Sequence, residues 1–123
     1  PIAERTLTGL AVLLQSQQLK QALAPWCVGG AWGRLLDAET ERLGEATVQV
    51  FETEGLMESG AAPAVLSYLF YRIAGRLDGS PTLIIIDEGW LALGSPAFAK
   101  QLSEWLVTLR KKNASVIFAT QSL

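Results

Sequence analysis

The sequence predicts an α/β fold in which helices flank a parallel β-sheet. An almost unbroken apolar run at 82–86 (TLIII) is typical of a central parallel strand that is buried on both faces. Residues 96–112 carry apolar side chains at helical spacing, and a second strand-like run (SVIFA) follows at 115–119. A strand, a helix and a strand in this order favour a crossover between parallel neighbours.

The elements before and between these strands extend the same pattern. Ser95 is a good helix N-cap, and Pro96 is a good first helical residue. Residues 47–51 (TVQVF) are rich in β-formers, and residues 61–77 place leucine and isoleucine along one helical stripe. We therefore expect a βαβαβ core over residues 46–123.

Residues 1–45 are expected to form a helical and loop segment of the same domain. Apolar spacing predicts a helix over 4–14, and Ser16 can cap a second short helix that Pro25 ends. The stretch 25–37 (PWCVGGAWGRLLD) is rich in glycine and tryptophan, which indicates a loop with local turns.

Composition describes a globular chain and excludes several kinds of site. Of 123 residues, 50% are hydrophobic and 18% are charged, and the formal net charge is -2. The whole surface therefore offers nucleic acid no attraction, so a basic site would have to be local. With Cys27 as the single cysteine and no histidine, an internal disulfide and a Cys/His metal site are excluded. Because the chain begins with proline, we expect it to be part of a longer one.

Polar side chains follow both of the later strands. Asp87 and Glu88 come directly after the first, and Thr120 and Gln121 come directly after the second. Ligands of parallel α/β sheets bind at the carboxyl ends of the strands, so we expect the candidate site at this edge.

The sequence IIIDE has the pattern of a Walker B motif. Asp87 at a strand tip can hold Mg²⁺, usually through a water, because the ion and nucleotide phosphates balance its charge. Glu88 can orient and deprotonate an attacking water, if a turn at Gly89 brings both acids to one cleft. The alternative is an acidic turn after a buried strand.

Two further groups can approach the same cleft. Gln121 at a neighbouring strand tip can bind the γ-phosphate or the attacking water; the alternative is a polar surface residue, and Thr120 beside it is expected to be structural. Glu52 and Glu54 flank the end of the 47–51 strand and form a weaker candidate pair.

Arg110, Lys111 and Lys112 form the only basic cluster. Cations in the last turn of a helix complement its dipole, and Asn113 suits a left-handed stop. The functional alternative is an arginine that reaches the nucleotide of a neighbouring subunit. Arg110 is favoured for this role because a planar guanidinium matches a phosphate better than an ammonium does. A nucleic-acid contact by Lys111 or Lys112 has weaker support.

Other conspicuous side chains are expected to be structural. Trp90 and Trp105 are interpreted as packing residues rather than platforms for stacking bases. Arg34 and Asp37 can pair within the glycine-rich loop.

One part of a nucleotide-hydrolysing site is missing from the sequence. No stretch matches G-x-x-x-x-G-K-[ST], which wraps the phosphates in sites of this kind, and 29–36 (GGAWGRLL) has glycines without the lysine. The phosphate loop is expected upstream of Pro1 or lost, so the isolated chain is expected to be inactive.

The chain resembles the C-terminal motor core of the large conjugal-transfer ATPases of type IV secretion. These are TrbE-like, VirB-type proteins related to the FtsK and HerA pumps. The resemblance covers most of the chain and is densest from Val48 to Leu123. WLVTLRKKNASVIFATQS is its most specific piece, and PTLIIIDEGWLAL, VLSYLFYRIAGRLDG, VQVFETEGLM and GGAWGRLLDAETERL support it.

The resemblance implies part of a RecA-like P-loop core that works as a hexamer at the cytoplasmic face of the inner membrane. ATP and Mg²⁺ would be its cofactors. Its task would be to drive pilus assembly and the transfer of DNA or protein, and its partners would be other secretion components. By position, Asp87 and Glu88 match the Walker B pair, Gln121 the strand-tip glutamine, and Arg110 the region of the intersubunit arginine. The alternative is a non-catalytic assembly module of the secretion apparatus. A stand-alone DNA-binding domain fits the net charge of -2 poorly.

Overall fold

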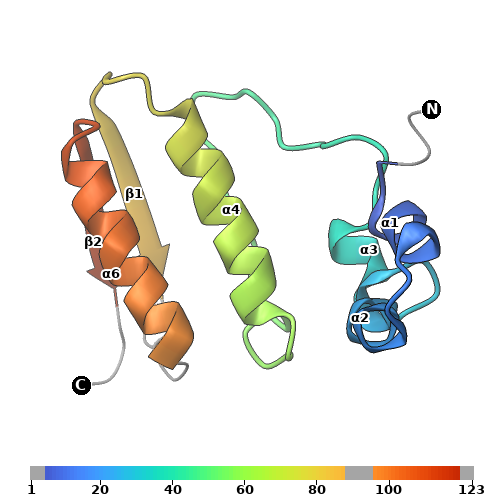
Figure 1. Cartoon of the computed structure of the whole chain (residues 1–123). Helices are drawn as coiled ribbons and strands as arrows, with labels where there is room; N and C mark the ends of the chain where they lie inside the picture. The colour runs from blue at the N-terminus through green and yellow to red at the C-terminus, as the bar shows by residue number, and fades with distance from the viewer. Residues whose placement is uncertain (1–4, 88–95, 120–123) are drawn as a thin grey trace. The chain divides into compact units, whose positions relative to one another are not determined.

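The computed structural model describes residues 5–87 and 96–119 and divides the chain into two compact units, 1–52 and 53–123. The first unit is helical, and the second contains two strands and two long helices (Figure 1). The expected α/β class with a parallel sheet is therefore confirmed, and the sheet is consistent with part of a RecA-like core. Within the described residues, no helix is both long enough and apolar enough to span a membrane.

The first unit contains three short α-helices and one 3₁₀ turn. They are α1 (Leu7–Leu13), α2 (Gln17–Leu23), η2 (Ala24–Trp26) and α3 (Gly33–Leu36). The predicted Ser16 cap is confirmed, since its hydroxyl accepts a hydrogen bond from the Leu19 amide at 3.4 Å. The two helices predicted from the spacing are thus present, and the second ends just before the turn that contains Pro25.

The glycine-rich loop of this unit is a packed turn. A side chain on Gly30 would collide with the carbonyl oxygens of residues 24 and 25, and one on Gly33 with that of Cys27. The rings of Trp26 and Trp32 lie 4.7 Å apart between their centroids. Glycine is therefore required here because the backbone of the loop approaches itself closely.

The carboxylate of Asp37 joins three segments of the first unit. Its oxygens accept hydrogen bonds from the Thr8 amide at 3.2 Å, the Thr8 hydroxyl and the Val28 amide at 2.8 Å. The partners that the structure gives Asp37 are thus neutral donors instead of the Arg34 side chain expected from the sequence. Partial burial works to raise the pKa of Asp37, but these hydrogen bonds outweigh it and lower the pKa below its usual value.

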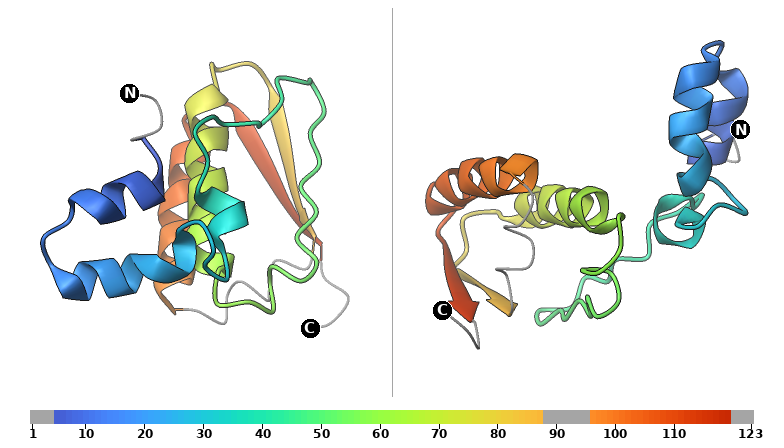
Figure 2. Two further views of the ribbon diagram at one scale, coloured as in Figure 1. Left: turned by 90° about the vertical axis from the view of Figure 1, so that its right-hand side faces the viewer. Right: turned by 90° about the horizontal axis from the view of Figure 1, so that it is seen from below.

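The second unit is a β-strand pair covered by two helices on one side. Its elements are α4 (Ala62–Arg76), β1 (Thr82–Asp87), α6 (Pro96–Arg110) and β2 (Ala114–Ala119). The strands are parallel, and their register pairs Thr82 with Ala114 and Asp87 with Ala119. In Figure 2, α4 and α6 lie side by side on the same face of the sheet.

The core of this unit lies between α4, α6 and the sheet. Leu102, Trp105 and Leu109 form the buried stripe of α6, and they pack with Leu66 of α4. The rings of Trp105 and Phe70 stack with centroids 4.1 Å apart, and the Trp105 indole nitrogen donates to the Phe70 carbonyl oxygen at 3.1 Å. Trp105 is therefore a packing residue with a satisfied polar group, as its spacing predicts.

Within the second unit, only one face of the sheet is covered, so the prediction of a strand buried on both faces is wrong for this unit. Burial alternates along β1, and the side chains of Leu83 and Ile85 are 58% and 63% exposed. Ile117 on β2 is 49% exposed on the same face. The apolar run predicted the strand correctly, but a sequence does not show whether a second layer is present.

The expected strand at 47–51 is also not formed. Val48 and Val50 are 80% and 88% exposed, and the structure assigns these residues to no helix or strand. A β-strand requires a hydrogen-bonding neighbour, and the sheet contains β1 and β2 alone among the described residues. The expected βαβαβ core is therefore reduced to a helix followed by one βαβ unit.

Asp37→Asn should loosen the first unit at neutral pH. Because the folded pKa is lowered, the carboxylate stabilises the fold above the unfolded pKa of about 3.9, and this effect is lost as pH falls through the folded pKa. We expect hydrogen exchange of the Thr8 and Val28 amides to quicken about fivefold at pH 7, which corresponds to about 1 kcal/mol for a partly open site. Glu39→Gln removes the same charge from an exposed side chain and is the control. Equal exchange rates in the two variants would contradict the role of Asp37.

Candidate functional site

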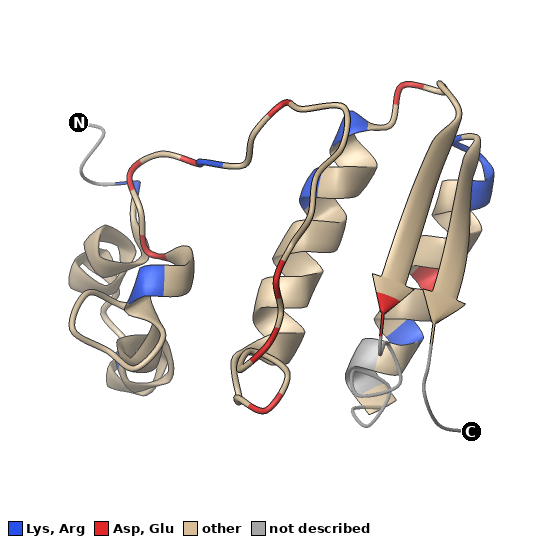
Figure 3. Cartoon of the chain, turned by 180° about the vertical axis from the view of Figure 1, so that it is seen from behind, with Lys and Arg blue, Asp and Glu red and all other residues tan. Residues whose placement is uncertain are grey.

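The two strands of the second unit end at the same edge of the sheet. Asp87 closes β1 and pairs in register with Ala119, which closes β2. Figure 3 shows the two arrowheads together at this edge. The side chain of Asp87 is exposed, so its carboxylate is open to a ligand at the carboxyl end of the sheet.

The other residues predicted at this edge lie outside the described part of the chain. They are Glu88, Thr120 and Gln121, and Trp90, interpreted as a packing residue, also lies outside it. The parallel register brings together the two strand ends from which these residues continue. The roles predicted for Glu88 and Gln121 therefore stay predictions.

Asp87 fits one part of a magnesium site. No group of three or more His, Cys, Asp or Glu side chains occurs among the residues that the structure describes. Mg²⁺ usually keeps several waters and is held by one or two carboxylates together with substrate phosphates. A single exposed carboxylate at the strand tip matches that ligand set and would hold the ion through a water.

Arg110 lies at the opposite edge of the sheet from Asp87. It is the last residue of α6 and is exposed, and β2 begins only a few residues later at Ala114. The strands are six residues long, which corresponds to about 20 Å. Figure 3 shows this basic stretch at the far end from the arrowheads. Arg110 therefore cannot serve the strand tips of its own chain, and only a neighbouring subunit can bring it to such a site.

Lys112 and Asn113 have structural partners that their charge and spacing did not predict. The Lys112 ammonium donates to the Leu77 carbonyl oxygen at 3.1 Å, and the Asn113 amide donates to the Gly79 carbonyl oxygen at 3.0 Å. Asn113 adopts φ 57°, so the predicted left-handed stop is confirmed. Within the basic cluster, Lys112 thus has a structural role.

Glu52 and Glu54 are exposed, and the strand at whose end they were expected is not formed. The structure therefore gives no support to their predicted approach to the strand tips.

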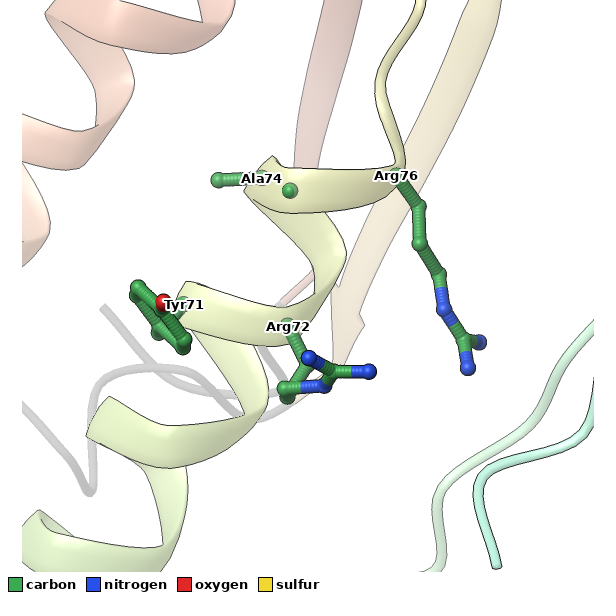
Figure 4. A pocket seen from close by; sticks show the side chains of 5 residues that line it. Tyr71, Arg72, Ala74 and Arg76 are labelled. Carbon is green, nitrogen blue, oxygen red and sulfur yellow. The ribbon is translucent and has the colours of Figure 1, made fainter. Parts of the chain in front are cut away.

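A shallow hollow of about 320 Å³ lies along the last turns of α4. Its lining residues all belong to this one helix, and Figure 4 shows Arg72 and Arg76 pointing to one side of it and Tyr71 to the other. The chain passes from the end of α4 to the start of β1, and Asp87 lies at the other end of β1. The hollow therefore lies at the edge of the sheet away from Asp87. It is a depression on a helix surface and forms no part of the strand-tip site.

The chain is similar to known secretion proteins along nearly its whole length. It is 46% identical over 121 residues to the conjugal transfer protein TrbE of Rhizobium radiobacter. The aligned stretch covers 97% of this chain and 15% of that protein. It is 30% identical over 127 residues to the type IV secretion system protein virB4 of Bartonella henselae, covering 99% of this chain and 16% of that protein.

A third match, over a shorter part of the chain, supports the same grouping. The chain is 37% identical over 106 residues to the type IV secretion system protein CagE of Helicobacter pylori, covering 82% of this chain and 11% of that protein. No protein-family model matches the chain. It spans less than a fifth of the length of the relatives just named. The 123 residues thus belong to the TrbE and VirB4 family of conjugal transfer and type IV secretion proteins, of which they match one section.

Proposed function

We propose that the chain forms the Walker B half of an ATP-hydrolysing site in a conjugal transfer motor. The observation that carries the proposal is the exposed Asp87 carboxylate at the tip of a strand in parallel register with β2. A parallel sheet that presents a carboxylate at its carboxyl edge is the arrangement in which nucleotide-bound Mg²⁺ is held. The relation to TrbE and VirB4 supports this choice over other ligands of such an edge.

Each predicted site residue has a defined task in this proposal. Asp87 holds Mg²⁺ through a water, and Glu88 accepts a proton from the attacking water. Gln121, two residues beyond the end of β2, binds the γ-phosphate or the attacking water. Bound Mg²⁺ would neutralise charge that develops on the phosphate oxygens.

The phosphate loop must come from outside these 123 residues. No G-x-x-x-x-G-K-[ST] occurs in the chain, and the relatives are several times longer than it. In the full-length protein, ATP hydrolysis would drive pilus assembly and transfer of DNA or protein, in contact with other secretion components. We place this assembly, as a hexamer, at the cytoplasmic face of the inner membrane.

A non-catalytic assembly module is the second candidate function. The apolar sheet face that includes Leu83, Ile85 and Ile117 is left open within the second unit, which suits a contact with another protein surface. Asp87 favours the motor instead, because assembly alone requires no carboxylate at a strand tip.

The isolated chain should not bind Mg-ATP at micromolar concentration, because a strand-tip carboxylate alone cannot enclose three phosphates. Calorimetric titration of the 123-residue chain, with Asp87→Ala as the control, measures this. Tight binding that Asp87→Ala abolishes would show that the nucleotide is held without a Walker A loop, and the proposed division of the site would be wrong.

Glu88→Gln in the full-length protein should lower ATP turnover by about 10²–10⁴-fold, because general-base catalysis contributes that much. Mg-ATP affinity should stay unchanged, since the amide keeps the size of the side chain. Glu104→Gln, on an exposed position of α6, is the matched control and should turn over normally. Normal turnover in Glu88→Gln would remove Glu88 from the mechanism, and no turnover in the wild type would favour the assembly module.

Arg110→Ala should lower turnover only when the full-length protein is oligomeric, because Arg110 lies about a strand length, or about 20 Å, from Asp87 in its own chain. Rates measured across a dilution series that dissociates the oligomer separate the two states. Lys111→Ala, one residue further on and also exposed, is the control. An equal loss of activity in the monomer would contradict action between subunits.

A further inference from the structure

The turn before β1 and the turn before β2 are joined by three hydrogen bonds. Two come from side chains, Lys112 to the Leu77 carbonyl oxygen at 3.1 Å and Asn113 to the Gly79 carbonyl oxygen at 3.0 Å. The third runs from the Thr82 amide to the Asn113 carbonyl oxygen at 3.2 Å. All three lie at the amino edge of the sheet, where both strands begin.

The geometry of the turns makes these contacts possible. Asn113 at φ 57° and Gly79 at φ 100° both lie in the left-handed region, which reverses the chain tightly at the start of each strand. The Asp78 carboxylate accepts the Ser80 amide at 2.9 Å and stiffens the first turn. The hydrogen bonds from Ser80, and to a smaller extent the charge of Lys112, lower the pKa of Asp78.

The packed face of the sheet excludes a one-residue slip of the register, but the pleat does not exclude a two-residue slip. Parallel neighbours have no hairpin turn that sets the pairing. Both strands present apolar side chains at most positions, so a slip by two residues keeps every side chain on its face of the sheet. Such a slip would move Asp87 by about 6.6 Å along β2. The position of the carboxylate relative to the end of β2 therefore depends on what fixes the register.

We propose that Lys112 and Asn113 are positioning residues that set the register of β1 on β2 and thereby place Asp87 at the strand-tip site. Both side chains bind the connection between α4 and β1, Lys112 at the Leu77 carbonyl oxygen and Asn113 at the Gly79 carbonyl oxygen. The catalytic consequence rests on the proposed ATPase function, whereas the register itself does not.

Neighbouring residues offer matched controls. Lys111 carries the same charge one position away, and its side chain is exposed. Lys112→Met removes the ammonium and keeps the length of the side chain, and Lys112→Arg keeps a donor. Asn113→Gly keeps the left-handed backbone and removes the side chain that carries the amide.

Disulfide trapping reads the register directly. In a Cys27→Ser background, Leu83→Cys with Ser115→Cys reports the native register, because these two residues are paired on the exposed face. Leu83→Cys with Ile117→Cys reports a two-residue slip, since diagonal neighbours about 7–8 Å apart are too distant to bridge without movement. Each pair is oxidised in the full-length protein under identical conditions, and the two cross-linking yields are compared.

We expect Lys112→Met and Asn113→Gly each to lower the ratio of native to slipped cross-link by about fivefold, the effect of losing one hydrogen bond. Lys112→Arg and Lys111→Met should leave the ratio unchanged. A ratio that neither Lys112→Met nor Asn113→Gly alters, at equal content of folded protein by circular dichroism, would overturn the proposal.

Turnover tests the consequence at the site. In the full-length protein without the cysteines, Lys112→Met should lower kcat in proportion to the fraction of chains that leave the native register, and Lys112→Arg should restore it. An unchanged kcat in a variant in which most chains cross-link in the slipped register would refute the positioning role. If the variants change the cross-link ratio but the wild-type protein hydrolyses no ATP, the proposed function is refuted and the register assignment stands.

Discussion

The second unit depends on the buried stripe of α6. Leu102, Trp105 and Leu109 are the side chains that turn this helix toward the sheet and α4, and Leu109 is 1% exposed. Each such side chain contributes roughly 1.5–3 kcal/mol when it is removed from water. Because α6 must cross back over the sheet to bury them, β2 runs parallel to β1 and begins at the same edge of the sheet. The shared carboxyl edge, where Asp87 lies, is a consequence of that packing.

Within the second unit, the packing leaves one face of the sheet uncovered. Parallel sheets occur almost only with both faces covered, because their strands are apolar on both sides. The exposed Leu83, Ile85 and Ile117 side chains therefore form the face on which this unit lacks a covering layer. The same surface is what makes the assembly-module alternative physically reasonable beside the motor.

The basic stretch shows that three adjacent cations need not share a role. Arg110 and Lys111 are exposed at the end of α6, whereas the ammonium of Lys112 is directed to a backbone carbonyl of another turn. One residue along a helix terminus rotates the side chain by about 100°, so neighbours face different surroundings. Similarly, Asp37 was expected beside the charged Arg34, but the chain brings it the amides of Thr8 and Val28.

Local patterns determined the elements of this protein. Apolar spacing, the cap at Ser16, the stop at Asn113 and the apolar run ending in Asp87 act within a few residues, so the sequence alone predicts them. The 47–51 segment is the exception, because β propensity becomes a strand only when a neighbour supplies hydrogen bonds. The structure alone decided which partners Lys112 and Asp37 find, which face of the sheet is covered, and that Arg110 lies a strand length from Asp87. These depend on contacts between residues far apart in the chain, which no local pattern encodes.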